Sequence, residues 1–250
     1  MSHASLPYRE FYYPLNVFMH LLTLEEGEVR YLHYGIFDRP DEPLIAAQER
    51  STSMLLERLP APPARVLDVG SGIGTTLHRL GQLGYTVIGI TPDDKQIAFI
   101  RARYGASVDV RQTRFEDFPS EQPFDAILFQ ESSQYIDSEA LFAQAATLTS
   151  RVLVLDEFAT QPVGHLHQWA PFVEAAARHG FSIVEEIDVT DRAAPTIDYF
   201  NARYPRYRDR LIADLELTAE TIDELMRGGF AYRAAYAQGD YSYRLADFRR

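Results

Sequence analysis

Cysteine is absent from this chain of 250 residues. Disulfide bonds, thiolate metal sites and a cysteine nucleophile are therefore excluded. No apolar run approaches the roughly 20 residues that a helix needs to cross a bilayer. The first residues also lack the basic start and apolar stretch of a secretory signal. We expect a cytoplasmic location and no membrane span.

Positive charge is scarce as well. The 24 basic residues stand against 36 acidic ones, which gives a formal net charge of -12, and Lys95 is the only lysine. Because the electrostatic field of a negatively charged protein repels phosphate groups, we expect no nucleic-acid partner. Apolar residues are abundant, with 46% hydrophobic and 12% aromatic content. This composition is typical of a globular protein with a sizeable core.

Short apolar segments alternate with amphipathic ones along most of the chain. Continuous apolar strands separated by helices indicate a mostly parallel sheet that is covered on both faces. The expected strands are 64–70, 86–91, 107–113, 124–130, 151–158, 181–189 and 241–248. The expected helices are 43–59, 93–104, 138–148 and 165–179, followed by a helical stretch over 195–237.

This pattern predicts an α/β domain over residues 43–250, with a helical cap at about 191–237. The cap would lie over the carboxyl ends of the strands, where ligands bind in open α/β folds. Residues 1–42 are rich in tyrosine and phenylalanine, and we expect them to fold over the same edge as an aromatic lid.

The strongest local pattern is the glycine-rich segment VLDVGSGIGTT. A strand leads to Gly70, Gly72 and Gly74, where missing β-carbons allow a sharp turn and a close approach to a ligand. A helix is expected to start at about Ile73, and its free amides favour anionic or hydroxyl-rich groups. Nicotinamide-binding proteins also use glycine turns. Here, however, the spacing is G-x-G-x-G, and Asp68 precedes the first glycine by two residues.

These residues resemble the first motif of the class I S-adenosylmethionine-dependent methyltransferases. The resemblance implies a Rossmann-like sheet of seven strands, mostly parallel, with an antiparallel last strand. It also implies S-adenosylmethionine as the cofactor. Asp68 would order the loop and the amino-acid end of that cofactor, together with Gly70, Ser71, Gly72 and Gly74.

Two further stretches resemble cofactor motifs of this family. The T-x-x-x-x-Q pattern of Thr91 and Gln96 is similar to that of the cyclopropane fatty acid synthase branch. On a helix that starts near Asp93, Gln96 faces the strand end where a ribose would lie. The stretch RFEDFP resembles the adenine-binding motif, which implies backbone contacts from Phe115 and Glu116, with the Phe115 ring against the adenine.

The stretch QESSQYID resembles the N-E-S-T-x-Y segment of bacterial geranyl diphosphate C-methyltransferases, in which the glutamate serves as a base. This resemblance implies Glu131 as the catalytic base, Gln130 next to the cofactor and Tyr135 near the acceptor. A carboxylate there can remove a proton or stabilise positive charge. The alternative interpretation is that Glu131 caps the helix near Ser138.

The aromatic N-terminal stretches FYYPLNVF and YLHYGIFD resemble segments that close over cofactor and acceptor in the cyclopropane synthase branch. They imply Tyr34 as a cofactor contact and Tyr12 and His33 as acceptor contacts, with ordinary packing as the alternative. His165 follows the fifth strand and is a candidate acceptor contact. Arg203 lies in the arginine-rich stretch NARYPRYRDR, which either clamps an anionic group or forms a solvated helix face.

Together these patterns predict transfer of a methyl group from S-adenosylmethionine to a small organic acceptor in specialised metabolism. Carbon is slightly favoured over nitrogen or oxygen as the accepting atom. No metal is expected, because the H-x-H pair at His165 and His167 lacks a third ligand. A Rossmann oxidoreductase using NAD and a non-catalytic protein that binds S-adenosylmethionine are the alternatives. Thr91 argues against the first, since an acid normally ends that strand in nicotinamide enzymes. The oligomeric state stays open, with a homodimer possible.

Overall fold

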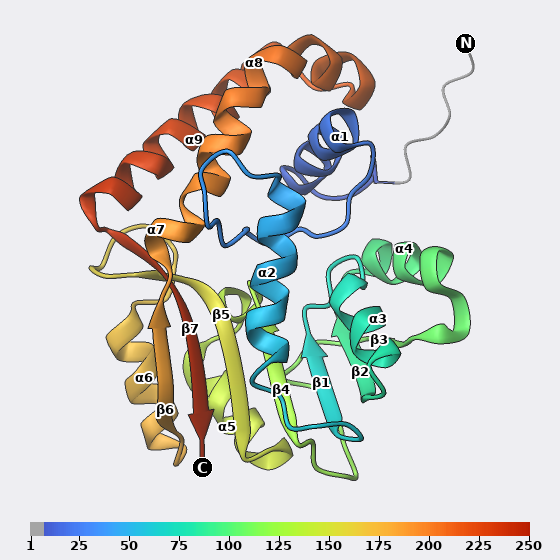
Figure 1. Cartoon of the computed structure of the whole chain (residues 1–250), viewed down its shortest axis with the longest axis vertical. Helices are drawn as coiled ribbons and strands as arrows, with labels where there is room; N and C mark the ends of the chain where they lie inside the picture. Colours follow the sequence, from blue (N-terminus) through green and yellow to red (C-terminus); the bar gives the residue numbers. More distant parts are fainter. Residues whose placement is uncertain (1–7) are drawn as a thin grey trace.

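A seven-stranded sheet forms the centre of the molecule (Figure 1). The computed structural model describes residues 8–250, so residues 1–7 of the predicted lid lie outside the described residues. The strand order is β3-β2-β1-β4-β5-β7-β6. The strands are β1 (Arg65–Val69), β2 (Thr86–Thr91), β3 (Asp109–Gln112), β4 (Ala126–Gln130), β5 (Arg151–Ala159), β6 (Ser182–Asp188) and β7 (Tyr241–Arg249).

The directions of the strands confirm the predicted topology. The first five strands pair in parallel, in the spatial order β3-β2-β1-β4-β5. The last strand, β7, lies between β5 and β6 and is antiparallel to both. The carboxyl ends of the parallel strands therefore meet along one edge of the sheet, where ligands bind in folds of this kind.

Apolar side chains cover both faces of this sheet. Phe142 of α5 (Ser138–Leu148) and Phe172 of α6 (Trp169–Arg178) pack with Phe129 on one face. Leu55 of α2 (Leu44–Leu56) and Leu80 of α3 (Thr75–Gln82) pack with strand residues on the other face. Helix α4 (Asp94–Tyr104) also packs on α3, and the short helices η1 (Gly105–Ser107) and η2 (Ser133–Tyr135) lie in connecting loops. Burial on both faces explains why the inner strands β1, β4 and β5 are buried almost throughout.

Three predicted helix boundaries need correction. The helix predicted over 43–59 is α2, which ends at Leu56. The helix after the glycine turn starts at Thr75 rather than Ile73. Gly74 precedes it with a left-handed φ of 81°, so the turn takes up two more residues than expected. The helix after β5 starts at Trp169, and His165 lies in the loop before it.

Four helices lie above the carboxyl ends of the strands (Figure 1): α1 (Leu15–Glu26), α7 (Thr190–Ala193), α8 (Pro195–Leu215) and α9 (Ala219–Gln238). Leu21 of α1, Leu211 of α8 and Ile222 of α9 are buried in one apolar cluster. Helix α1 therefore shares its core with the cap helices. The division of the chain into a lid and a main domain stays a prediction.

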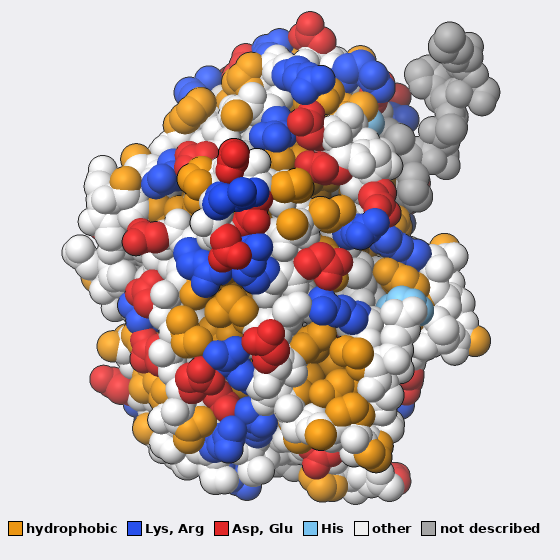
Figure 2. Space-filling model, in the orientation of Figure 1, with side chains coloured by type: hydrophobic (Ala, Val, Ile, Leu, Met, Phe, Trp, Pro, Cys, Tyr) orange, Lys and Arg blue, Asp and Glu red, His pale blue; other side chains and the backbone are white. Residues whose placement is uncertain are grey.

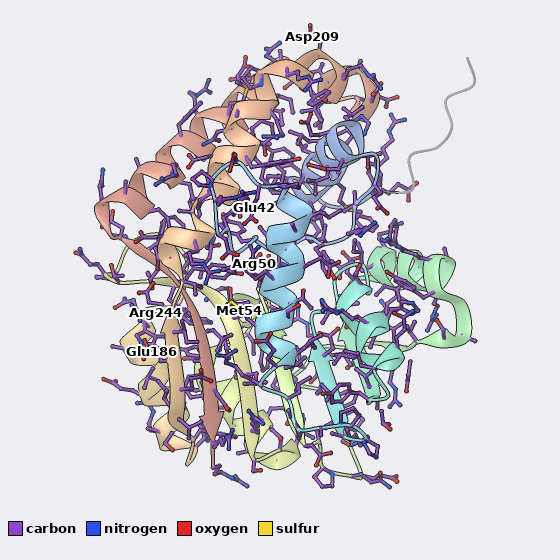
Figure 3. The ribbon with its side chains drawn as sticks, in the orientation of Figure 1. Glu42, Arg50, Met54, Glu186, Asp209 and Arg244 are labelled. Carbon is purple, nitrogen blue, oxygen red and sulfur yellow. The ribbon has the colours of Figure 1, made fainter. Side chains whose placement is uncertain are left out.

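Charged side chains of both signs are mixed across the face that Figure 2 shows. Figure 3 shows two pairs within this pattern, Arg50 with Glu42 and Arg244 with Glu186. The second pair joins β7 to β6. Among residues 8–250, every helix is too short or too polar to span a lipid bilayer.

Candidate functional site

A cavity of about 780 Å³ lies at the carboxyl ends of the parallel strands. Most residues that the sequence predicts for the site line this cavity. They are Tyr12, His33, Tyr34, Asp68, Gly70, Ser71, Gly72, Thr91, Gln96, Phe115, Glu116, Gln130, Glu131 and Tyr135. Gly74, His165 and Arg203 do not line it. The structure thus brings together residues that span about half of the chain.

The glycine turn has three different local environments. A β-carbon on Gly70, where φ is 73°, would lie 2.4 Å from the Ser132 β-carbon, so this position admits only glycine. Gly72 also has a left-handed φ, 53°, but a β-carbon there would meet only Leu32, at 3.4 Å, and Gly70. At Gly74, a β-carbon would lie 3.0 Å from Ile100 of α4. Gly72 therefore exposes backbone to the cavity, whereas Gly74 permits helix packing and its prediction as a cofactor contact is corrected.

Asp68 carries a buried oxygen without a partner. The residue is 2% exposed, and its Oδ2 atom accepts no hydrogen bond from residues 8–250. Burial raises the pKa of this carboxyl to about 6. Buried polar atoms nearly always have a hydrogen-bond partner. A donor on a ligand, such as the α-amino group of an amino acid, would supply what is missing here.

Thr91 and Gln96 meet at the end of β2, as the sequence predicts. The Thr91 hydroxyl donates a 2.8 Å hydrogen bond to Oε1 of Gln96. The carboxylate of Asp93 accepts from the backbone amides of Lys95 and Gln96, so Asp93 caps α4. The side-chain amide of Gln96 keeps its own N–H donors for a hydroxyl-bearing ligand.

An aromatic wall lies next to this polar corner. Phe115 is 2% exposed, and its ring meets the ring of Phe129 edge to face at 5.2 Å. Both Phe115 and Glu116 line the cavity. A flat heterocycle such as adenine would find an apolar face and backbone groups together at this point.

A chain of hydrogen bonds fixes Gln130. Its side-chain amide donates to the Thr52 hydroxyl at 3.2 Å, and that hydroxyl lies 3.0 Å from Nε2 of His33. Nδ1 of His33 lies 2.9 Å from the carbonyl oxygen of Tyr34. Burial lowers the pKa of His33 to about 4, so the ring is neutral, with Nδ1–H as donor and Nε2 as acceptor. His33 lines the cavity, but both of its ring nitrogens are engaged.

Glu131 is held in an unusual backbone conformation. Its φ is 53°, a left-handed value that costs a non-glycine residue about 1–2 kcal/mol. Its Oε1 atom accepts 2.5 Å hydrogen bonds from the Tyr34 amide and the Tyr243 hydroxyl. Burial, and then the neighbouring Glu157, raise the pKa of Glu131 well above its usual range. Asp137 provides the cap of α5, which argues against the helix-cap interpretation of Glu131.

Glu157 of β5 is a cavity residue that the sequence reasoning missed. Its Oε1 atom accepts hydrogen bonds from the hydroxyls of Tyr232, at 3.0 Å, and Tyr236. Burial raises the pKa of Glu157 to about 7. A signal was present, because Glu157 is near the carboxyl end of the strand that neighbours β4, and Glu131 directly follows β4.

The remaining predicted acceptor contacts lie at the rim of the cavity or outside it. Tyr12 is 51% exposed and Tyr135 is 78% exposed, so both line the opening. His165 is exposed in the loop before α6. Nε of Arg203 lies 3.1 Å from Glu25, and its guanidinium lies 3.4 Å from the centre of the Tyr199 ring. Arg203 therefore joins α8 to α1, which corrects its prediction as an acceptor contact.

Clusters suited to a metal ion were sought among residues 8–250. No group of three or more His, Cys, Asp or Glu side chains has that arrangement there. Glu131 is instead bonded to a backbone amide and a tyrosine hydroxyl, and Glu157 is bonded to tyrosine hydroxyls.

Known proteins are similar to this chain in sequence over part of its length. Residues 66–153 match a family model described as a methyltransferase domain. Over 117 residues the chain is 32% identical to the ubiquinone biosynthesis O-methyltransferase of Xanthomonas campestris pv. campestris strain B100, which covers 44% of this chain and 49% of that protein. The chain spans about half the length of the curated relatives that it matches.

Solved structures match over most of the chain. The cyclopropane synthase MmaA2 from Mycobacterium tuberculosis has a TM-score of 0.79 at 18% identity, covering 88% of this chain and 90% of that chain. Geranyl diphosphate C-methyltransferase from Streptomyces coelicolor A3(2), solved with Mg²⁺, geranyl diphosphate and S-adenosyl-L-homocysteine, has a TM-score of 0.66 at 19% identity. It covers 88% of this chain and 91% of that chain. At these identities the likeness shows the shared fold.

Proposed function

We propose that this chain is an S-adenosylmethionine-dependent methyltransferase that transfers a methyl group to a small organic acceptor. The methyltransferase model matched by residues 66–153 and the fold shared with the cyclopropane synthase support this proposal. The unpartnered Oδ2 of Asp68, in the cavity that Gly72 leaves open, is the observation that carries this proposal. A carboxylate with a free lone pair suits the ammonium group at the amino-acid end of this cofactor.

The cavity residues divide into three regions for this cofactor. Asp68 and the backbone of Gly70, Ser71 and Gly72 would hold the amino-acid end. Thr91 and Gln96 would hold the ribose, and Phe115 with Glu116 the adenine. Tyr34 and Gln130 would contact the cofactor next to the acceptor. When bound, S-adenosylmethionine supplies a methyl group on a positively charged sulfur.

The acceptor would bind between Glu131, His33 and the rim tyrosines Tyr12 and Tyr135. Methyl transfer is an in-line displacement, so much of the acceleration can come from holding the two reactants in line. Glu131 then serves as the base that removes a proton from the acceptor. We favour a carbon acceptor over nitrogen or oxygen, and a role in specialised metabolism.

Isothermal titration calorimetry tests the cofactor part of this proposal. We expect S-adenosylmethionine and S-adenosylhomocysteine to bind and NAD not to bind. Asp68→Asn should weaken S-adenosylhomocysteine binding at least about tenfold, because the carboxylate is lost. Asp94→Asn, an exposed position on α4, is the matched control and should bind as the parent does. Binding of NAD without a response to S-adenosylhomocysteine would overturn the proposal.

A methyl-transfer screen tests the activity. Methyl-labelled S-adenosylmethionine is incubated with a panel of small phenols, amines, alkenes and prenyl compounds, and labelled products are separated. We expect label to appear in a panel member in an enzyme-dependent way. Cofactor binding together with no transfer to any small molecule would favour the non-catalytic alternative.

A further inference from the structure

Two carboxyl groups enter the cavity from neighbouring strands. The backbone amide of Glu131 donates to the carbonyl oxygen of Leu155 at 2.9 Å. Glu131 therefore lies alongside β5, next to Leu155, and Leu155 precedes Glu157 by two residues. Both Glu131 and Glu157 line the cavity. Glu131 belongs to the region that the proposed function assigns to the acceptor, and Glu157 lies on the neighbouring strand.

Tyr243 is a neighbour of both residues. It lies opposite Glu157 in the antiparallel pairing of β5 and β7. Residues directly opposite in such a pair have β-carbons about 4.5–5.5 Å apart. The Tyr243 hydroxyl donates to Glu131, so the residue that bonds Glu131 is the cross-strand neighbour of Glu157.

Other titratable groups around the pair are tyrosines and one more acid. Tyr34 stacks on Tyr243 at 5.7 Å, and α9 contributes the two tyrosines that bond Glu157. Burial, followed by the nearby carboxyl groups, raises the pKa values of the Tyr34, Tyr232, Tyr236 and Tyr243 hydroxyls, so they keep their protons and act as donors. Buried Asp156 accepts from the backbone amide and hydroxyl of Ser133.

Basic side chains are not available to this pair. Three basic residues among residues 8–250 line the cavity: His33, Arg30 and Arg114. Arg30 pairs with Glu28 at 2.7 Å, and Arg114 is exposed beyond β3, at the end assigned to adenine. Arg203, which could have held an anion, is bonded to Glu25. The acceptor end of the cavity is therefore acidic.

We infer that Glu131 and Glu157 act as one acid–base unit, a carboxyl pair that holds a single proton and selects neutral or cationic acceptors over anionic ones. This inference rests on the proposed function for the identity of the reaction. Two carboxylates in one desolvated site cannot both ionise readily, so one keeps its proton. Burial raises the pKa of both groups, which agrees with this assignment.

The reaction balances with one proton accepted by the pair. An electron pair of the acceptor forms the bond to the methyl carbon, and the carbon–sulfur bond breaks with its electrons left on sulfur. The acceptor then carries one additional positive charge, and it gives up a proton to the ionised carboxylate. The surrounding tyrosine hydroxyls stabilise that carboxylate before the transfer. The pair releases its extra proton to solvent when the product leaves.

Infrared titration with S-adenosylhomocysteine bound tests whether the pair shares a proton. We expect one protonated carboxyl band at pH 7 in the parent that is lost in the double variant Glu131→Gln/Glu157→Gln. In either single variant, the remaining carboxyl should titrate at a lower pH than in the parent, because the repulsion is gone. Glu174→Gln on the exposed face of α6 is the control. Midpoints that are the same in the parent and in both single variants would overturn the pair.

Binding of three compounds with one carbon skeleton tests the selection. Geranylamine, geraniol and geranyl diphosphate are titrated into the protein saturated with S-adenosylhomocysteine. We expect the amine and the alcohol to bind at least about tenfold more tightly than the diphosphate. In Glu157→Gln, the affinity for the diphosphate should be closer to the affinities for the amine and the alcohol. Tightest binding of the diphosphate would overturn the inference. Failure of S-adenosylhomocysteine itself to bind would instead overturn the proposed function, so the two failures are distinguishable.

Discussion

The hydroxyl of Tyr243 donates a 2.5 Å hydrogen bond to Oε1 of Glu131, across a sequence separation of 112 residues. The last strand of the chain thus supplies a donor to the carboxyl group that follows the fourth strand. This bond favours the ionised form of Glu131 and opposes the effect of burial on its pKa. The antiparallel insertion of β7 next to β5 is what brings the two residues together.

Replacing Tyr243 with phenylalanine should raise the pKa of Glu131 further, because the donor is lost. We expect the infrared midpoint of this carboxyl to move to higher pH while the affinity for S-adenosylhomocysteine stays unchanged. Tyr85→Phe is the matched control, since it removes the hydrogen bond from a tyrosine hydroxyl to the carbonyl oxygen of Pro60. An unchanged midpoint in Tyr243→Phe would show that the hydroxyl does not tune Glu131.

Gly72→Ala should lower the affinity for S-adenosylhomocysteine at least about tenfold in a folded protein, because its methyl group would project into the open cavity. The positive φ adds a backbone cost of about 1–2 kcal/mol. Gly239→Ala has the same kind of cost, with a φ of 80° and no atom within 4 Å of the added carbon, but lies at the end of α9. Calorimetry compares the two variants. Equal affinities would show that the turn does not contact the cofactor.

Asp68 should make the ligand-free protein less stable as the pH rises from about 4 to about 6. The pKa of this carboxyl is about 6 in the folded state against an ordinary value of 3.8, so the folded state binds more protons in this window. The free energy of unfolding then falls with rising pH, by up to about 3 kcal/mol from this group.

Urea denaturation at pH 4 and pH 7.5 measures this contribution. Asp68→Asn cannot ionise, so its free energy of unfolding should fall less between these pH values than that of the parent. In the exposed Asp94→Asn variant, the free energy of unfolding should change between these pH values as much as it does in the parent. If the free energy of unfolding of Asp68→Asn changes with pH as much as that of the parent, the raised pKa of Asp68 is contradicted.

The sequence predicted those parts of the site that depend on local pattern. The glycine turn, the Thr91–Gln96 pair and Glu131 each follow directly from a strand end, and a parallel sheet brings consecutive strand ends together. Glu157 follows the same rule. It was missed because neither of the two acids in LDEF belongs to a recognised motif.

Contacts with residues distant in the sequence explain why the other site predictions differ from the structure. The arginine-rich stretch gave no sign that Glu25, far along the chain on α1, would engage Arg203. Gly74 looked like part of the cofactor turn, but its role depends on the approach of Ile100 from α4. The tyrosine donors come from α9 and β7. The position of Tyr243 depends on a strand register that periodicity does not specify.

Glu131→Gln separates catalysis from cofactor binding. The amide keeps the shape of the side chain but removes its charge and basicity. We expect the affinity for S-adenosylhomocysteine to change little, while turnover of the acceptor found in the methyl-transfer screen falls by about 10²–10⁴-fold, as for a lost general base. A carbon acceptor, which must lose a proton after methylation, should show the largest loss. Calorimetry and initial rates measure the two quantities.

Glu174→Gln provides the control for this substitution, because it removes an exposed carboxylate of α6 that lies outside the cavity. It should turn over the acceptor at the parent rate. If Glu131 and Glu157 act as one unit, the double variant should lose little more activity than the more damaging single variant, since each removes the same function. Additive losses would mean two independent roles. Parent-like turnover in Glu131→Gln with normal cofactor binding would make Glu131 structural, and its resemblance to the base of the C-methyltransferases would be misleading.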